Sequence, residues 1–233
     1  MNKVDKNDLI AVEKPVGILS HPNDSASKTA LSKSVKESLV GAEYHEKGEY
    51  YAIAHENPAR KKLYLLNRLD SATSGLMLLT FNKDVANNVK KQFSSRLVKK
   101  SYVAVVFGHP QSKAAIWNSV VRVCSSNSSG ELRLVRARTA ERNRDSGAKI
   151  AETHVRVLKK FHVDLPLEHE PSTMSDIATA AADDDTAKPR KHAHTKRIPM
   201  SVLELRPVTG YTHQLRYQCA EHGLPIVGDK KYG

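Results

Sequence analysis

Residues 66–75 read LNRLDSATSG, a stretch that places one carboxylate among turn-forming residues between two apolar segments. Ser, Thr and Gly favour tight turns, and the apolar run LMLL begins directly after Gly75. A side chain in such a turn is displayed instead of being packed into a core. Asp70 is therefore the first candidate for a catalytic carboxylate, although an Asp here can also do no more than cap the turn.

The segments around this stretch predict the fold class. The apolar run at 75–81 suits a strand buried on both faces, and Asn82 or Asp84 can cap a helix with apolar positions every four residues. A second helix is plausible at 30–40. Further strands are predicted at 9–13, 97–107, 131–138, 150–158 and 200–205. Because strands outnumber helices and several follow one another directly, we expect an α+β fold with a mostly antiparallel central sheet and flanking helices and loops.

Residues 163–197 do not fit this pattern. They are polar, with an acidic run at 183–185 and a basic end at 188–197. A segment of this composition cannot bury enough apolar surface to offset its ordering entropy. We expect an inserted surface loop, at least partly mobile, between two strands. Its basic end either contacts a polyanionic partner or is simply solvated.

A second informative stretch, TGYTHQLR at 209–216, supplies a turn that opens a predicted helix and ends in Arg216. An Asp in a binding pocket tends to protonate as water leaves, so it needs a cationic partner that keeps it charged. Arg216 can be that partner of Asp70. The plainer alternative is an ordinary exposed Arg on a helix.

Together these two stretches resemble the signatures of the RluA-type pseudouridine synthases, which read RLDxxTSG and TGxTHQ-hydrophobic-R. Three further matches, VEKPVG at 12–17, KSYVA at 100–104 and GLPIVGD at 223–229, follow in the order of that family. The resemblance implies a single catalytic domain over 1–233 with the pseudouridine synthase fold. It also implies an isomerase that converts uridine to pseudouridine in structured RNA (rRNA or tRNA) by base flipping and an Asp-dependent rearrangement of the glycosidic bond, without cofactor or metal.

The resemblance also suggests roles for single residues. Asp70 acts at the ribose, Arg216 holds Asp70 ionised, and Tyr102 stacks on the target uracil, although a half-buried strand Tyr would look the same in sequence. Arg68, two residues before Asp70, can reach a phosphate or fill the space of a flipped base, unless it forms a structural salt bridge. The residues expected to contact substrate or RNA are Arg68, Thr73, Lys99, Lys100, His213, Gln214 and Leu215, the last of which can equally be a core residue.

The chain departs from the family pattern at several places. Asn67 stands where most relatives have His, and Tyr211 where Arg usually follows Thr-Gly. Both changes weaken any transfer of substrate preference. Family members usually continue beyond the point where this chain ends, so we expect either a fragment or a family domain without its C-terminal part. The small N-terminal S4-like RNA-binding domain of the family is not apparent.

Composition favours a polyanionic partner, because the formal charge is +12, from 37 Lys and Arg against 25 Asp and Glu, and the pI is near 9.6. We expect that partner to be RNA and not a membrane, since no stretch is an apolar span and the first residues are not a signal peptide. The protein is expected to be a monomer and intracellular, most readily cytoplasmic, with organelle or nucleus left open. Two cysteines do not suggest a disulfide framework.

Three rival functions remain in view. A non-catalytic RNA-binding or ribosome-assembly protein with this fold would carry the same charge. Loss of activity would leave Asp70, Tyr102 and Arg216 free to change, yet all three are present. A hydrolase acting on a nucleoside or sugar leaves the positive charge unexplained. A metal enzyme is remote, because His192, His194, His213 and His222 lack a recognised ligand spacing.

Overall fold

The computed structural model describes residues 8–22, 37–54, 61–123, 132–134, 149–166 and 195–233. The chain divides into two compact units, residues 1–99 and 100–233. Each unit is built around its own antiparallel sheet and is described by itself.

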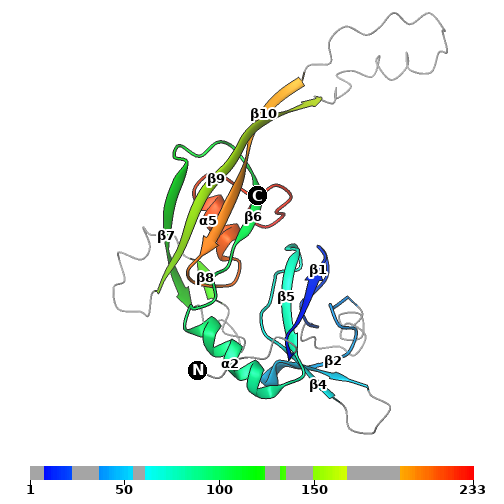
Figure 1. Cartoon of the computed structure of the whole chain (residues 1–233). Coiled ribbons are helices and arrows are strands. Elements are labelled where there is room, and N and C mark those ends of the chain that lie inside the picture. The colour runs from blue at the N-terminus through cyan, green and yellow to red at the C-terminus, as the bar shows by residue number, and fades with distance from the viewer. Residues whose placement is uncertain (1–7, 23–36, 55–60, 124–131, 135–148, 167–194) are drawn as a thin grey trace, which may run out of the picture. The chain divides into compact units, whose positions relative to one another are not determined.

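The first unit contains a five-stranded sheet in the order β1-β5-β4-β3-β2 (Figure 1). Every neighbouring pair is antiparallel. The apolar residues on one face form its core, in which Tyr51 and Met77 are completely buried. The strands are β1 (Ile10–Lys14), β2 (Glu43–His45), β3 (Tyr50–Ile53), β4 (Lys61–Leu65) and β5 (Gly75–Thr80), and a short 3-10 helix, η2 (Glu46–Gly48), joins β2 to β3.

Helix α2 (Lys83–Ser94) follows β5 and begins where the sequence predicts. The Asn82 side chain accepts hydrogen bonds from the backbone N–H groups of Asp84 and Val85, as an N-cap does. The apolar face of the helix, with Val85 and Val89, packs with Leu66 in a second small core. Leu66 lies four residues before Asp70, so this core supports the segment that carries the candidate carboxylate.

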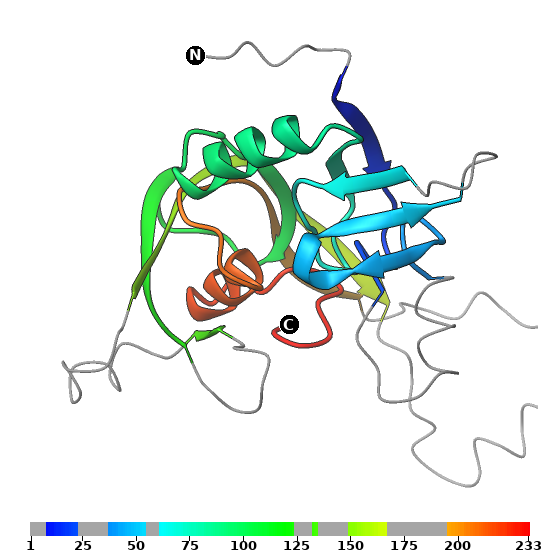
Figure 2. The same cartoon turned by 90° about the horizontal axis from the view of Figure 1, so that it is seen from below.

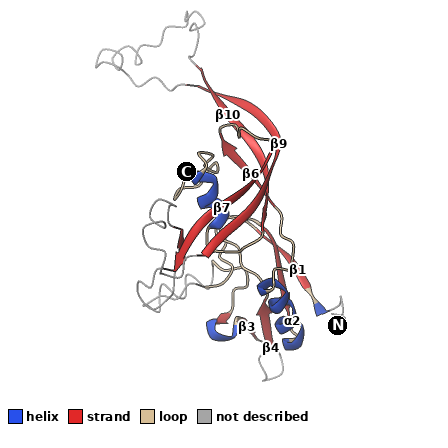
Figure 3. Cartoon of the chain, turned by 90° about the vertical axis from the view of Figure 1, so that its left-hand side faces the viewer, coloured by secondary structure: helices blue, strands red, loops and turns tan. Residues whose placement is uncertain are grey.

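The second unit contains a sheet in the order β6-β10-β9-β7-β8, again antiparallel throughout. Strands β9 and β10 pair from Pro207 opposite Thr153 to Thr195 opposite Pro166, with one register shift at Val202/Leu203. They run past the rest of their sheet as a two-stranded ribbon, which is clear in Figure 3. The strands are β6 (Tyr102–Phe107), β7 (Ala114–Val123), β8 (Leu132–Leu134), β9 (Lys149–Pro166) and β10 (Thr195–Pro207).

Helix α5 (Gln214–Glu221) lies in the hollow of this curved sheet, as the orange and red ribbon shows in Figure 2. Val106, Leu203 and Leu205 are completely buried in the core beneath it, together with Cys219 of the helix itself. Burial raises the pKa of the Cys219 thiol to about 12. This residue is therefore a small apolar core residue, as the sequence suggests.

The predicted α+β class with antiparallel sheets is confirmed. The prediction that 75–81 is buried on both faces is wrong, because Leu76, opposite Glu13 of β1, is 62% exposed. The predicted strand at 97–107 begins only at Tyr102, and strands β2, β3, β4 and β7 were not predicted. Most of the predicted helix at 30–40 lies outside the described residues, and 37–40 is turn and bridge.

The ends of the segment 163–197, predicted as an inserted loop, belong to strands instead. Strand β9 continues to Pro166 and β10 begins at Thr195, because Phe161 and Val163 continue the alternation of the strand. Residues 167–194 lie outside the described residues.

Candidate active site

Asp70 lies in a turn directly before β5 in the first unit. The backbone N–H of Thr73 donates to the Asp70 carbonyl oxygen at 3.0 Å, which closes the turn. Gly75 is the first residue of β5 and has a φ of +138°, a backbone conformation that residues other than glycine rarely adopt. Asp70 itself is half-buried, so its carboxylate is only partly desolvated.

The residues on both sides of Asp70 are held by the segment 14–20. The Ser20 hydroxyl donates to the Leu69 carbonyl at 2.6 Å and accepts from the Leu69 N–H at 2.9 Å. On the other side, the Gly17 N–H donates to the Ser71 carbonyl at 2.7 Å. Because both neighbours of Asp70 are bound, the backbone that carries the carboxylate is fixed in place.

Lys14, the last residue of β1, is buried beneath this turn and has no exposed surface. Its ammonium donates to backbone carbonyls of its own segment and to the Ser71 carbonyl next to Asp70. A buried ammonium thus contacts the backbone of the residue that follows the candidate catalytic Asp. The sequence reading did not assign Lys14 to the site.

Arg68 is exposed and its Nη1 lies 3.1 Å from Nε2 of His21. The other ring nitrogen of His21 lies 2.9 Å from the Pro22 carbonyl, so Nδ1 carries the hydrogen and Nε2 accepts from Arg68. The His21 ring stacks on Tyr44, with centroids 4.7 Å apart and planes 15° apart. The Arg68 guanidinium is thus held by an aromatic pair, and its RNA contact stays a prediction.

Asn67, which departs from the family signature that the sequence resembles, continues the ladder to β5 with its side chain. Its Oδ1 accepts from the Leu78 N–H at 2.8 Å, and its Nδ2 donates to the Leu76 carbonyl at 3.2 Å. The amide thus supplies both a donor and an acceptor, as a backbone residue of a strand would. This departure from the family pattern supports the approach to Asp70 instead of disrupting it.

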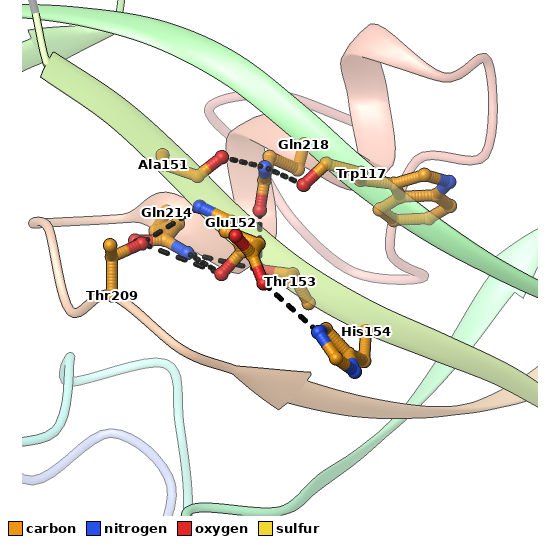
Figure 4. Close-up of polar contacts among 8 residues, drawn as sticks. All are labelled: Trp117, Ala151, Glu152, Thr153, His154, Thr209, Gln214 and Gln218. Carbon is orange, nitrogen blue, oxygen red and sulfur yellow. Dashed lines mark hydrogen bonds and ion pairs between the residues drawn. The ribbon is translucent and has the colours of Figure 1, made fainter. Parts of the chain in front are cut away.

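In the second unit, two buried glutamines one turn apart fix α5 to the sheet (Figure 4). Gln218 donates to the Ala151 carbonyl at 3.1 Å and accepts from the Thr153 hydroxyl at 2.6 Å. Gln214 donates to the same hydroxyl at 3.0 Å and accepts from Thr209 at 2.9 Å. Since the Gln214 amide is only 3% exposed, its role in this structure is to hold the turn, and the RNA contact expected for it stays a prediction.

Arg216, between these glutamines, binds Asp229 through both side-chain oxygens. Nε lies 2.7 Å from Oδ2 and Nη2 lies 2.9 Å from Oδ1. Asp229 also accepts from the backbone N–H groups of Lys231 and Tyr232. The hydrogen bond from Arg216 holds the pKa of the Asp229 carboxyl far below its usual range.

Tyr232 completes the surroundings of this guanidinium. The Arg216 guanidinium carbon lies 5.3 Å from the centre of the Tyr232 ring, within the range of a cation–π contact. The Tyr232 hydroxyl lies 3.1 Å from Nδ1 of His213, another residue expected at the site. Residues 229–232 therefore fix the direction in which Arg216 points.

The other predicted site residues lie as follows. Tyr102 and Leu215 are partly buried and pack against the core of the second unit, so their pocket contacts stay predictions. The Lys100 ammonium donates to the Thr209 carbonyl at 3.1 Å, which joins two of the motifs. Lys99 is exposed, whereas Lys90 of α2 is paired with Glu49 at 2.8 Å.

Asp70 belongs to the first unit, whereas Tyr102 and Arg216 belong to the second. The predicted pairing of Asp70 with Arg216 therefore stays a prediction. Sequence reasoning missed Lys14 and Asp229, although both lie in the matched motifs. Lys14 follows Ile10 and Val12 at every second position of β1, and this alternation is the signal that could have placed its side chain on the same face as theirs.

None of the helices in the described part of the chain is both long and apolar enough to cross a membrane. The chain has an α+β fold with two antiparallel sheets. Asp70 lies in a turn before β5 of the first sheet, and Arg216 lies on helix α5 beside the second. Solved structures share this fold. The structure of human RNA pseudouridylate synthase domain containing 1 matches with a TM-score of 0.54 and 22% identity, over 99% of this chain and 68% of the other.

The sequence comparisons go further than the fold. The model of the RNA pseudouridylate synthase family matches residues 8–221, and the chain belongs to this family. RNA pseudouridine synthase 1 of Oryza sativa is 30% identical over 78% of this chain and 52% of its own length. The dual-specificity RNA pseudouridine synthase RluA of Vibrio parahaemolyticus is 28% identical over 96% of this chain and 65% of its own length. The chain thus spans about half to two thirds of these relatives.

Proposed function

We propose that this protein isomerises uridine to pseudouridine within structured RNA, such as the rRNA or tRNA on which relatives are named to act. The bond from ribose C1′ to N1 of uracil breaks, the base turns, and a bond from C1′ to C5 forms. C5 gives up its proton and N1 gains one, so no atoms are added or lost overall. An ionised carboxylate beside the sugar is what this reaction requires.

The observation that carries the proposal is the position of Asp70. Its two neighbours in the chain are bound by Ser20 and Gly17, so the carboxylate is presented from a fixed backbone. Such fixing matters because a misplacement of about 1 Å at a reacting group can cost about a hundredfold in rate. Asp70 either attacks C1′ or removes a ribose proton.

The second unit supplies the remaining roles in this proposal. Tyr102 stacks on the uracil after it has left the RNA stack, and Arg216 supports the negative charge of Asp70. The excess of basic residues attracts the phosphates of the RNA. Base flipping, the monomeric state and the cytoplasmic location stay predictions.

The test uses RNA that carries tritium at C5 of uridine, because C5 loses its hydrogen when the new bond forms. The full chain should release tritium, and Asp70→Asn should release none above background while it keeps its fold and most of its RNA affinity. Asp84→Asn is the matched control, since Asp84 is an exposed Asp of the same unit. Turnover by the Asp70→Asn variant would remove Asp70 as the essential group. RNA binding without turnover by the intact chain would favour a non-catalytic RNA-binding protein.

A further inference from the structure

Glu204 lies in β10 between Leu203 and Leu205, which are completely buried in the core beneath α5. Because side chains alternate along a strand, Glu204 points to the opposite face of the sheet, which we call the outer face. On this face Val103, opposite Glu204 on β6, is 67% exposed. Ile116 of β7 is 60% exposed. A carboxylate among such exposed neighbours is expected to be solvated, unless other polar side chains cover it.

Two arginines of the outer face cover the Glu204 carboxylate. Arg156 lies opposite Glu204 on β9; its Nε donates to Oε2 at 2.8 Å, and its Nη2 lies 2.7 Å from the same oxygen. Arg206 lies two positions along β10; its Nε donates to Oε1 at 2.9 Å, and its Nη2 lies 2.7 Å from that oxygen. The Ser101 hydroxyl also donates to Oε1, at 3.1 Å. The Glu204 side chain is therefore only 12% exposed.

The cluster of Arg156, Arg206 and Glu204 keeps an excess of positive charge. The hydrogen bond from Arg206, followed by that from Arg156, lowers the pKa of the Glu204 carboxyl, so this group stays ionised. Arginine is protonated at every relevant pH. Two positive charges therefore share one negative charge, and one arginine would already balance the carboxylate.

The charges around this cluster do not remove the excess. Lys159, opposite Val202 on the outer face, adds a further cation. The Glu152 carboxylate adds an anion, and it lies 3.0 Å from the ring of His154. The outer face of the paired strands is thus positive around the cluster.

Each guanidinium also has hydrogens left for a second anion. An arginine carries five N–H bonds, and the contact with Glu204 uses one at Nε and one at Nη2. The remaining N–H bonds of Arg156 and Arg206 have no acceptor among the residues that the structure describes. Since these two side chains are 62% and 61% exposed, their remaining donors face solvent.

This arrangement suits a phosphate better than it suits a purely structural ion pair. Exposed ion pairs contribute little to stability, so a second arginine on the same carboxylate adds little. A guanidinium held along one edge presents its remaining N–H bonds in a fixed plane, and a phosphodiester offers two oxygens to such a planar donor. With a formal chain charge of +12, the polyanion that fits is a nucleic acid backbone.

We propose that Arg156 and Arg206 bind a backbone phosphate of the RNA on the outer face, with Glu204 holding both guanidinium groups in place. Tyr102 lies opposite Leu205 and so belongs to the other face of the sheet. The phosphate bound by the arginines therefore belongs to RNA that flanks the target uridine. The inference deepens the proposed function and rests on it for the identity of the polyanion, but RNA binding can be measured without any turnover.

The first experiment measures the affinity of the full chain for a fluorescently labelled, unmodified tRNA transcript at several salt concentrations. Arg156→Gln and Arg206→Gln should each weaken binding by about fivefold and reduce the salt slope by about 1, as the loss of a phosphate contact does. Arg197→Gln is the matched control, because it removes the same charge from the other face of β10 and should cost much less. Equal losses in the three variants would reduce the effect to net charge and overturn the inference. Unchanged affinity in folded Arg156→Gln and Arg206→Gln would overturn it too, and would leave the cluster to an acidic protein partner or to the fold.

Lysine variants cover the case in which a glutamine variant does not fold. Arg156→Lys and Arg206→Lys keep the net charge and an ion pair with Glu204, but they lose the planar, two-point geometry. Their melting temperatures should stay within a few degrees of that of the intact chain, and their RNA affinities should lie between those of the intact chain and the glutamine variants. Affinities equal to that of the intact chain in both lysine variants would overturn the proposed two-point contact.

Catalysis is then measured separately as tritium release at varied RNA concentration. The loss in Arg156→Gln and Arg206→Gln should appear in KM more than in kcat, because the proposed contact lies away from the reacting atoms. A purely structural role predicts a lower melting temperature with unchanged RNA affinity and KM, which would contradict the inference. If the intact chain binds RNA without turnover, the proposed function fails, and the binding measurements still decide the role of the two arginines.

Discussion

The Arg216 guanidinium donates hydrogen bonds to both carboxylate oxygens of Asp229, at 2.7 and 2.9 Å, although 13 positions separate the two residues. The pair is largely withdrawn from solvent, with side-chain exposures of 16% and 4%. A two-point contact of this kind fixes the plane of the guanidinium as well as its position. Arg216 can then face a second anion only in the direction that Asp229 leaves open.

Asp229→Asn should destabilise the second unit. An amide cannot replace the charge-assisted contacts of a carboxylate, and it removes the Asp229 charge from a guanidinium that is only 16% exposed. We expect a loss of about 1–3 kcal/mol and a melting temperature lower by several degrees. Thermal unfolding at pH 7 measures this change. Asp84→Asn, at an exposed helix position, should cost much less, and equal losses in the two variants would contradict the importance of the pair.

The same pair makes stability depend on pH in a defined direction. The pKa of the Asp229 carboxyl is lowered in the folded chain, first by the hydrogen bond from Arg216, so the unfolded chain takes up the proton more readily. The contribution of the pair is complete above the unfolded pKa of about 4 and is lost as the pH falls below it. The stability gap between the intact chain and Asp229→Asn should therefore narrow between pH 7 and pH 3. A gap that widens towards acid would have the wrong sign.

Much of the first unit could be predicted from sequence because its signals are local. The turn residues before Gly75, the apolar run of β5 and the Asn82 cap each lie within a few residues of the structure that they specify. Strands β2, β3 and β4 were not predicted, because each is only three to five residues long and none shows a clear alternation of polar and apolar side chains. Their pairing is set by contacts along the sheet and not by their own patterns.

The candidate site shows the same limit. The motifs point to Asp70, Tyr102 and Arg216 because their residue types carry chemistry. The acceptors of Lys14 are backbone carbonyls, and the Ser71 carbonyl lies 57 positions away in sequence. Every residue has a backbone carbonyl, so the type of residue at position 71 does not indicate that it accepts a hydrogen bond from Lys14. The partner of a buried lysine is therefore visible only in three dimensions.

Arg216→Leu should reduce turnover severely even when RNA still binds, because it removes the cation proposed to support Asp70. Arg216→Lys should restore turnover only in part, since an ammonium lacks the planar, two-point geometry of a guanidinium. Single-turnover rates and RNA affinities of both variants check this.

Asp229→Asn separates the two roles of Arg216. If Arg216 serves only to bind Asp229, then Arg216→Leu and Asp229→Asn should lose similar amounts of turnover and of stability. If it also acts on Asp70, Arg216→Leu should be much slower at a similar melting temperature. Turnover of Arg216→Leu at the rate of the intact chain would exclude the role at Asp70.

Gln218→Leu should be among the more destabilising substitutions in α5. Gln218 is completely buried, and its amide joins the helix to the Ala151 carbonyl and the Thr153 hydroxyl. A leucine fills similar space but leaves these polar groups without partners, which costs about 1–3 kcal/mol. Urea unfolding measures the loss, and Gln111→Leu, at an exposed position, is the control. Equal stability of the two variants would show that water replaces the amide.

RNA affinity should depend strongly on salt if the excess of basic residues binds phosphates. We expect a loss of more than about tenfold between about 50 and 200 mM salt, because each neutralised phosphate releases condensed counterions. Two lysines of the first unit sharpen the test. Lys99 is exposed, so Lys99→Gln should weaken binding and reduce the salt slope by about 1 if it contacts a phosphate. Lys90 is already paired with Glu49 at 2.8 Å, so Lys90→Gln should change both quantities much less. Equal effects of the two substitutions would mean that net charge, and not a positioned contact, governs RNA binding. An RNA affinity that does not change with salt would exclude binding dominated by phosphate contacts.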